Sequence, residues 1–184
     1  MEPRALSRYL REGDDPDLRR RRWVVGLSLL GAAMGQVVAL YQTGIVKHLP
    51  DPPGPFDSDR VDASEYAYKR FESPDGPAMV ASYAVTAWLA AAGGPDRPGS
   101  SPWLPVALAA KTLYDTGLAA ELAREEWQDN RALCAYCQVA TVASAASLAF
   151  ALPEAARAAR RLLGRDGAGD GGAGGVAAAM AGVD

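Results

Sequence analysis

The chain has 184 residues, of which 49% are hydrophobic and 22% are charged, and its formal net charge is -3. This length suits one domain, and a small negative charge without a basic stripe argues against a nucleic-acid-binding protein. Two cysteines are too few for a disulfide-stabilised scaffold. The mean hydropathy of -0.08 conceals a strong segregation, because four apolar stretches alternate with very polar segments.

The first apolar stretch follows a polar and basic segment, residues 1–22, which ends in four consecutive arginines. It covers residues 23–46, which is long enough for a helix that crosses a bilayer with some tilt. A signal peptide is the alternative, but the stretch is longer than a signal-peptide core and no cleavage site follows it. We therefore expect a retained membrane helix, in which Gly31 and Gly35 allow close contact with another helix.

A polar segment, residues 47–76, comes next and opens with a proline-rich run that excludes a helix there. Residues 59–71 then predict a short helix that either lies flat on the membrane or is solvated as part of the loop. Residues 77–94 form a second apolar stretch, which is rich in alanine and marginal in length for a span. Residues 95–100 form a turn.

The third apolar stretch, residues 103–123, carries two charges, Lys111 and Asp115, which lie four residues apart on one helix face. Charges inside a membrane are costly unless they are paired and face the bundle interior. Two roles remain open for the pair: a structural bridge between helices, or part of a path for protons. A soluble amphipathic helix is a further interpretation of this stretch.

The fourth apolar stretch, residues 132–152, begins with the chain's two cysteines, Cys134 and Cys137. Residues 154–184 are basic at first and then rich in glycine and alanine, a composition that is typical of a disordered tail. We predict an all-α fold, an integral membrane four-helix bundle over residues 23–153 with a polar outer loop after the first helix. Residues 1–22 and 154–184 would flank this domain.

The distribution of arginine predicts an orientation in the cell membrane. Four spans place both termini on one side, together with the arginines at 19–22, at 97 and at 157–165. The positive-inside rule assigns that side to the cytoplasm. Cys134 and Cys137 then lie near the outer face, where disulfides persist.

The spacing of Cys134 and Cys137 brings two thiols to one helix face, where they can form a disulfide. The free N–H groups at a helix start favour a thiolate, and Arg131 would add positive charge. A disulfide that only stabilises the fold is the alternative, although so short a loop gives little stabilisation. A structural zinc site needs four ligands and only His48 accompanies the cysteines, so we expect no metal.

Several parts of the chain resemble the vitamin K epoxide reductase family. They are the four expected spans, the long outer loop, the segment RALCAYCQ at 131–138, the segment LYQTG at 40–44, the helix of Lys111 and Asp115, and the stretch around Trp127. The resemblance covers roughly residues 23–153. It implies a bundle around a pocket for a membrane quinone of the ubiquinone or menaquinone type. It also implies that Cys134 exchanges electrons with a thiol partner and that Cys137 lies closest to the quinone.

Members of this family usually carry another cysteine pair in the first outer loop, which passes electrons to the CxxC pair. The chain departs from this pattern, since residues 47–76 contain no cysteine. An extracytoplasmic thioredoxin-like thiol protein would therefore have to reach Cys134 directly. We predict a membrane thiol–disulfide oxidoreductase that contacts lipid and quinone and has Cys134 and Cys137 as its catalytic residues. A non-catalytic membrane bundle or subunit with a residual CxxC pair is the alternative.

Aromatic side chains are the candidates for contact with a quinone ring. They are Tyr41, Tyr83, Trp88, Tyr114 and Tyr136. Each is also a common packing or interface residue in membrane helices. We favour Tyr136, weakly, because it lies between the two cysteines.

Overall fold

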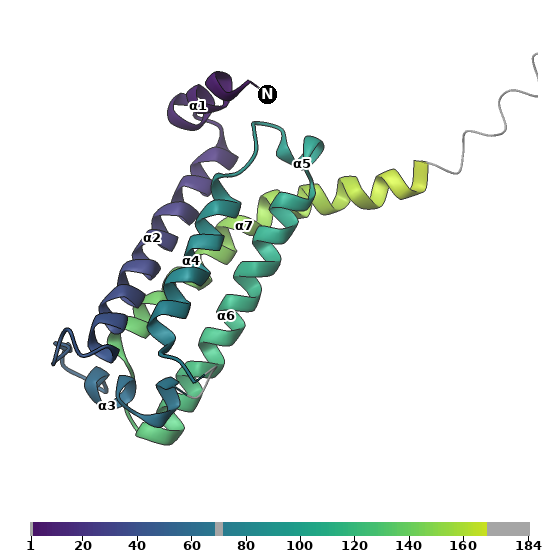
Figure 1. Ribbon diagram of the computed structural model, residues 1–184. Helices are drawn as coiled ribbons and strands as arrows, with labels where there is room; N and C mark the ends of the chain where they lie inside the picture. The colour runs from purple at the N-terminus through teal and green to yellow at the C-terminus, as the bar shows by residue number, and fades with distance from the viewer. Residues whose placement is uncertain (1, 69–71, 169–184) are drawn as a thin grey trace, which may run out of the picture.

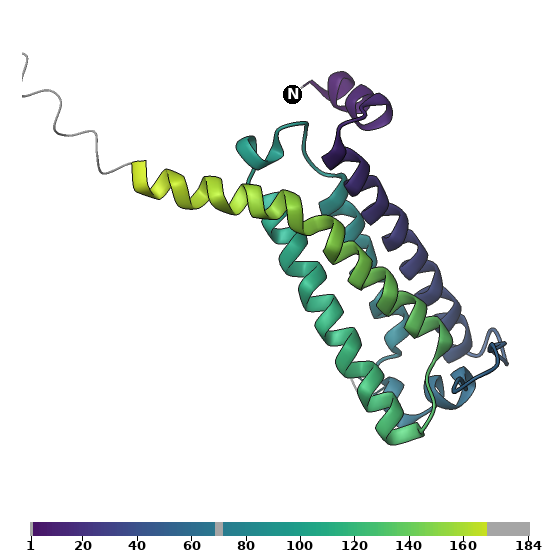
Figure 2. The same cartoon turned by 180° about the vertical axis from the view of Figure 1, so that it is seen from behind.

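Four long helices lie side by side in a bundle (Figures 1 and 2). The computed structural model describes residues 2–68 and 72–168, and every regular element in these ranges is helical. The long helices are α2 (Pro16–Gln42), α4 (Asp75–Ala91), α6 (Trp103–Asn130) and α7 (Ala135–Ala168). The short ones are α1 (Pro3–Glu12), α3 (Ser58–Asp62), η1 (Glu65–Tyr68) and α5 (Arg97–Ser100). The predicted all-α class is confirmed.

Helix α2 packs against α4 and α7, and α6 packs against α7. The outer faces of all four helices carry exposed large apolar side chains, among them Trp23, Leu29, Val85, Trp88, Trp103, Leu113, Val142 and Leu152. Two of the helices, α2 and α7, are long and apolar enough to cross a membrane. The prediction that all four cross it stays a prediction.

Helices α2, α6 and α7 are each longer than the hydropathy pattern indicates. Helix α2 begins at Pro16 rather than at residue 23, because the Asp15 carboxylate accepts hydrogen bonds from the N–H groups of Asp17 and Leu18. Proline at the first position of a helix supports this start. Helix α6 continues to Asn130, beyond the expected end of the third apolar stretch at residue 123. Its C-cap residue, Arg131, has a left-handed conformation with a φ of 52°.

Helix α7 passes through Pro153 and continues to Ala168, so the predicted end of the fourth helix at residue 152 is wrong. The reason is tertiary contact beyond the proline: Ala155 and Ala158 are buried, and Glu154 forms a buried ion pair. The last part of α7 turns away from the bundle (Figure 2). Most of the predicted disordered tail, residues 169–184, lies outside the described residues.

The contact between α2 and α4 depends on glycine. A Cβ atom on Gly31 would lie 2.3 Å from the ring of Tyr83, and one on Gly35 would lie 3.1 Å from the Gly76 carbonyl oxygen. Only a residue without a side chain therefore fits at Gly31 while Tyr83 keeps its place. The two glycines allow the close helix contact that their spacing predicts.

Two buried arginines close the end of the bundle at which α1 and α5 lie (Figure 1). The Arg21 guanidinium donates hydrogen bonds to the carbonyl groups of residues 90–94, at and beyond the C-terminus of α4. Arg97 donates to the Leu89 and Ala92 carbonyls and binds both carboxylate oxygens of Glu154 at 2.7 Å. Both cations stabilise the negative end of the α4 dipole. Both arginines are therefore structural, although they are among those on which the predicted membrane orientation rests.

We expect Glu154→Ala to destabilise the protein strongly. The substitution leaves the fully buried Arg97 guanidinium without its carboxylate, and breaking such a pair costs about 3–5 kcal/mol. Arg161→Ala is the matched control, because it breaks an exposed pair with Asp96 at the same end of the bundle and should cost about 1 kcal/mol or less. Unfolding of the two variants in detergent micelles, followed by circular dichroism, measures the difference. Equal losses would contradict a structural role for the buried pair.

We expect Gly31→Ala to displace Tyr83 and to lower the unfolding free energy by about 1–3 kcal/mol, the usual cost of overpacking. Gly26→Ala on the same helix is the control, because no atom lies within 4 Å of its Cβ position. That variant should be unchanged or slightly more stable, since alanine favours a helix over glycine by about 1 kcal/mol. A Gly31→Ala variant as stable as Gly26→Ala would refute the close contact.

Candidate functional site

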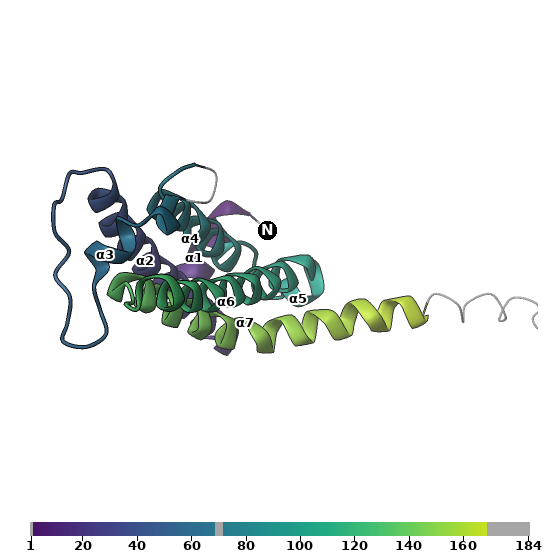
Figure 3. The same ribbon diagram turned by 90° about the horizontal axis from the view of Figure 1, so that it is seen from below.

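The two cysteines lie at the start of α7, at the end of the bundle that carries α3 (Figure 1). The loop after α2 holds this segment by main-chain hydrogen bonds. The Leu133 N–H donates to the Pro55 carbonyl at 2.9 Å, and the Asp57 N–H donates to the Leu133 carbonyl at 3.1 Å. Phe56 and Leu133 thereby form an isolated parallel bridge. Figure 3 shows the long loop passing from α2 toward this end of α7.

Side chains reinforce the attachment between the loop and α7. The first N–H group of α7, that of Ala135, donates to the Ser58 hydroxyl at 3.0 Å. Asp51 holds Ser58 in place by accepting hydrogen bonds from its hydroxyl and its N–H, both at 2.6 Å. The Tyr136 hydroxyl donates to the Pro50 carbonyl at 2.9 Å. The loop therefore covers the start of α7.

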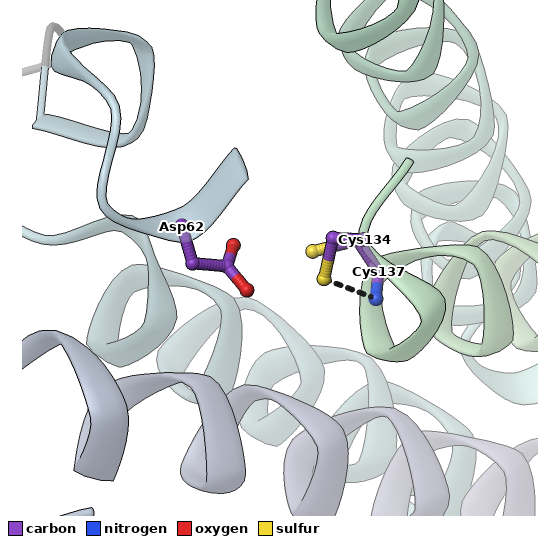
Figure 4. Close-up of side chains that lie close together, drawn as sticks. All are labelled: Asp62, Cys134 and Cys137. Atoms are coloured by element: carbon purple, nitrogen blue, oxygen red, sulfur yellow. Dashed lines mark hydrogen bonds between the residues drawn. The ribbon is translucent and has the colours of Figure 1, made fainter. Parts of the chain in front are cut away.

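Cys134 and Cys137 are both free thiols, and they differ in exposure. Cys134 is 0% exposed, whereas Cys137 is partly buried. Cys134 is the N-cap residue of α7, and its Sγ atom accepts a hydrogen bond from the Cys137 N–H at 3.1 Å (Figure 4). The sequence correctly predicts that the two side chains share one face.

Asp62, the last residue of α3, points its carboxylate toward the two sulfur atoms (Figure 4). A carboxylate oxygen of Asp62 and the Sγ atoms of Cys134 and Cys137 all lie within 4.8 Å of one another. Asp62 is 1% exposed, and its Oδ2 atom has no hydrogen-bond partner. Burial raises the pKa of Asp62 to about 7, although hydrogen bonding to Cys134 opposes the shift. No sequence pattern singles out Asp62.

A second buried carboxyl group lies beside the cysteine segment. Glu126, in the last turn of α6 and beyond the expected span, is 3% exposed. Its Oε2 atom accepts hydrogen bonds from the Cys134 N–H and from the Gln138 side chain, each at 3.3 Å. Burial raises the pKa of Glu126 to about 7, and the Cys134 N–H partly opposes this rise. No sequence pattern singles out Glu126, which lies beyond the third apolar stretch.

The helix start was expected to favour the thiolate form of a cysteine, but the structure favours the protonated thiol at Cys134. Hydrogen bonding with Cys137 lowers the pKa of the Cys134 thiol, but burial and the Asp62 carboxylate outweigh this effect and the net pKa is raised. Arg131, which was expected to add positive charge, is exposed in the turn between α6 and α7. The Cys134 thiol is therefore favoured in its protonated form, and its deprotonation needs an acceptor.

A cavity of about 240 Å³ opens between α4, α6 and α7. Cys137 lines this cavity, and Cys134 is not among its lining residues. Its apolar wall includes Ala78, Met79, Leu118, Ala119, Leu122 and Ala140. Its polar lining includes Tyr83 and Glu126. The cavity thus gives a small apolar molecule access to one of the two thiols.

The five aromatic candidates have different surroundings. Tyr83 lines the cavity, and its hydroxyl bonds to the Ala140 carbonyl at 2.5 Å and to the Ser144 hydroxyl at 2.8 Å. Trp88 and Tyr114 are exposed on the outside of the bundle, and the Tyr41 hydroxyl donates to the Asp59 carbonyl. Tyr136 contacts the loop and is not among the residues that line the cavity. Its role as a quinone ligand stays a prediction.

The charged pair on α6 forms as its spacing predicts. The Lys111 ammonium binds the Asp115 carboxylate at 2.5 Å and the Ser82 hydroxyl of α4 at 2.8 Å. This arrangement links α4 to α6, as a structural bridge requires. Asp115 and Ser82 also line the cavity, so the alternative role in a proton path stays a prediction.

We expect Glu126→Gln to stabilise the protein more at about pH 8 than at about pH 5. A carboxyl group whose folded pKa is about 7, above its ordinary 4.5, stabilises the fold fully only below the ordinary value and loses this contribution as the pH rises to about 7. Glutamine cannot ionise and can still accept the hydrogen bond from Cys134. Denaturant unfolding at the two pH values, with exposed Asp129→Asn as the control, measures the difference. A gain that does not depend on pH would contradict the raised pKa.

The comparisons with known proteins agree with these features. The sequence model for the vitamin K epoxide reductase family matches residues 22–152, which include all four long helices in whole or in large part and both cysteines. No curated protein and no solved structure matches the chain. A match over this much of the sequence, together with the helical bundle and the paired cysteines, shows that the chain belongs to the vitamin K epoxide reductase family, a family of helical membrane proteins.

Proposed function

We propose that the chain is a membrane thiol–disulfide oxidoreductase in which Cys134 and Cys137 pass two electrons to a membrane quinone. Family membership supports the oxidoreductase class. The cavity is the observation that supports a quinone as the electron acceptor, because Cys137 and apolar side chains line it together. A quinone of the ubiquinone or menaquinone type has the planar, apolar ring that such a cavity accepts.

The proposed reaction balances as a two-electron transfer. The two S–H bonds of Cys134 and Cys137 break, one S–S bond forms, and the quinone becomes a quinol by taking up two electrons and two protons. Asp62 lies near both thiols and Glu126 accepts a hydrogen bond from the Cys134 N–H, and each carboxyl group has a pKa near 7. They are therefore suited to accept a thiol proton near neutral pH and to release it again.

Electrons would enter the site through Cys134. An extracytoplasmic thioredoxin-like protein, as the donor, must attack the Cys134 sulfur in the oxidised pair, because Cys137 faces the cavity. Cys134 is fully buried beneath the loop that carries α3, so this attack requires the loop to move away from Leu133. The loop itself has no cysteine that relays electrons.

We further propose that all four long helices cross the cell membrane with both termini in the cytoplasm. Exposed tryptophans on three of them, Trp23, Trp88 and Trp103, suit an apolar or interfacial environment. The CxxC pair would then lie near the outer face, and the acidic loop would cover it there. The basic ends of α2 and α7 would lie on the opposite, cytoplasmic side.

A second candidate function is that of a non-catalytic membrane bundle or subunit. The complete burial of Cys134 and the lack of loop cysteines favour it. In that case the two thiols would not change their oxidation state when quinone is supplied.

The decisive experiment is thiol trapping in isolated membranes. Reduced protein is incubated with an oxidised quinone, denatured, and labelled with a maleimide that shifts its migration on a gel. We expect the quinone to convert both wild-type thiols to a disulfide, and we expect Cys137→Ser to abolish the loss of free thiol. Ser147→Ala, a buried change on α7 outside the lining of the cavity, is the control and should behave like wild type.

The opposite result would be equally clear. If the wild-type thiols stay reduced while an authentic thiol–quinone enzyme is reoxidised in parallel, the proposed activity is wrong and the non-catalytic function is favoured.

A further inference from the structure

We propose that the reduced site binds a thiophilic divalent cation of the Zn²⁺ type through Cys134, Cys137 and Asp62. This binding goes beyond the proposed function. Its consequence, which is that the metal prevents oxidation of the thiols by quinone, rests on the proposed function. The site joins two elements that are far apart in the sequence, the loop helix α3 and the start of α7 (Figure 4).

The geometry of the donor atoms supports the proposal. The two Sγ atoms and a carboxylate oxygen of Asp62 all lie within 4.8 Å of one another. Zinc bonds of about 2.3 Å to sulfur and about 2.0–2.2 Å to oxygen place two tetrahedral ligands roughly 3.5–3.8 Å apart. The donors would therefore have to approach one another by about 1.3 Å or less. Rotation of one side chain can provide a shift of this size.

The unpartnered Oδ2 atom of Asp62 provides an independent indication. Asp62 is 1% exposed and its Oδ2 atom has no hydrogen-bond partner, which is costly for a buried carboxylate. The neighbouring charges with the largest effect on it are also acidic, namely Asp75, Glu126 and Asp51. A cation at the thiols would supply the missing positive charge and would use the free oxygen.

The chemistry of the donors selects the class of metal. Thiolates are soft ligands that favour Zn²⁺ and Cd²⁺, whereas Mg²⁺ and Ca²⁺ prefer sites made of oxygen alone. Cysteine and histidine alone do not provide enough zinc ligands in this sequence, whereas the folded structure adds Asp62 as a third ligand. Water from the cavity beside Cys137 can complete a tetrahedral set.

Metal binding and thiol oxidation exclude each other. When the cation binds, two S–H bonds are replaced by two metal–sulfur bonds and two protons are released, without any change in oxidation state. When the disulfide forms, both thiolate ligands are lost and Asp62 remains as a single weak ligand. The site should therefore bind the metal when it is reduced and release it when it is oxidised.

Cadmium is the probe for the experiment, because cadmium thiolates absorb in the ultraviolet through charge transfer. The full chain, reduced and purified in detergent micelles, is titrated with Cd²⁺. We expect one Cd²⁺ per chain and no band of this kind after the disulfide has formed. Asp62→Asn should weaken binding by about 10-fold or more, since even ligands outside the first coordination sphere commonly contribute 10–100-fold. Asp62→Cys, which offers a third thiolate, should restore tight binding.

The matched control is Asp59→Asn on the same short helix. The Asp59 carboxylate accepts a hydrogen bond from the Leu49 N–H and bonds to His48, and it is not part of the donor cluster. Its loss should leave the affinity for Cd²⁺ unchanged. Thiol counting on each denatured variant confirms that both cysteines are present and reduced.

Two results would overturn the proposal: no charge-transfer band in fully reduced wild-type protein, or equal affinities in wild type and Asp62→Asn. Quinone oxidation of metal-free thiols is measured separately by maleimide trapping, so failure of the metal site and failure of the proposed function are distinguishable. If the metal site and the proposed function are both correct, adding Cd²⁺ should stop the oxidation of the thiols by quinone, and a chelator should restore it.

Discussion

The main-chain bridge between the loop after α2 and the start of α7 determines how the site is built. Two hydrogen bonds, from Leu133 to Pro55 and from Asp57 to Leu133, hold the loop against the CxxC segment. This attachment places α3 over Cys134 and brings Asp62 within reach of both sulfur atoms. It also makes the two thiols unequal, because one is enclosed by the loop while the other faces the cavity. The proposed electron transfer needs this inequality, because the thiol donor would react with Cys134 and the quinone with Cys137.

The two ends of the bundle bury ionisable groups of opposite charge. At one end, the carbonyl groups at the C-terminus of α4 receive two buried guanidinium groups, and Glu154 neutralises one of them. At the other end, two buried carboxyl groups flank a pair of thiols, and the strongest neighbouring charges on Asp62 are acidic. Thiolates formed at this end would add more negative charge. Under the proposed function, proton uptake by the carboxyl groups would therefore be coupled to the redox state of the cysteines.

Local sequence patterns account for much of the fold. Hydropathy correctly indicates the four long helices, and the spacing of Gly31 and Gly35 correctly predicts a close helix contact. The predicted helix ends were less accurate. Helix α7 continues past Pro153, where Glu154 forms a long-range ion pair with Arg97. No periodic pattern predicts such a pair, which joins residues that are 57 positions apart.

The site itself was only half predictable from the sequence. The cysteines have a recognisable spacing, but Asp62 and Glu126 resemble the other acids of polar segments. Their burial arises from the attachment of the loop to Leu133, which joins segments far apart in the chain. Sequence patterns report on neighbours within a helix, whereas this contact depends on the whole bundle. The two carboxyl groups therefore became visible only in three dimensions.

The missing loop cysteines change what the loop can do. Where a relay pair is present in the family, a loop can carry electrons as well as cover the site. Here the residue that faces the thiols from α3 is an aspartate, which can exchange a proton or bind a cation but cannot carry electrons. In the proposed reaction, electrons would then have to enter through Cys134 itself, which is buried while Leu133 stays paired with the loop. The same hydrogen bonds that bring Asp62 to the thiols would therefore limit the rate at which an outside donor reaches them.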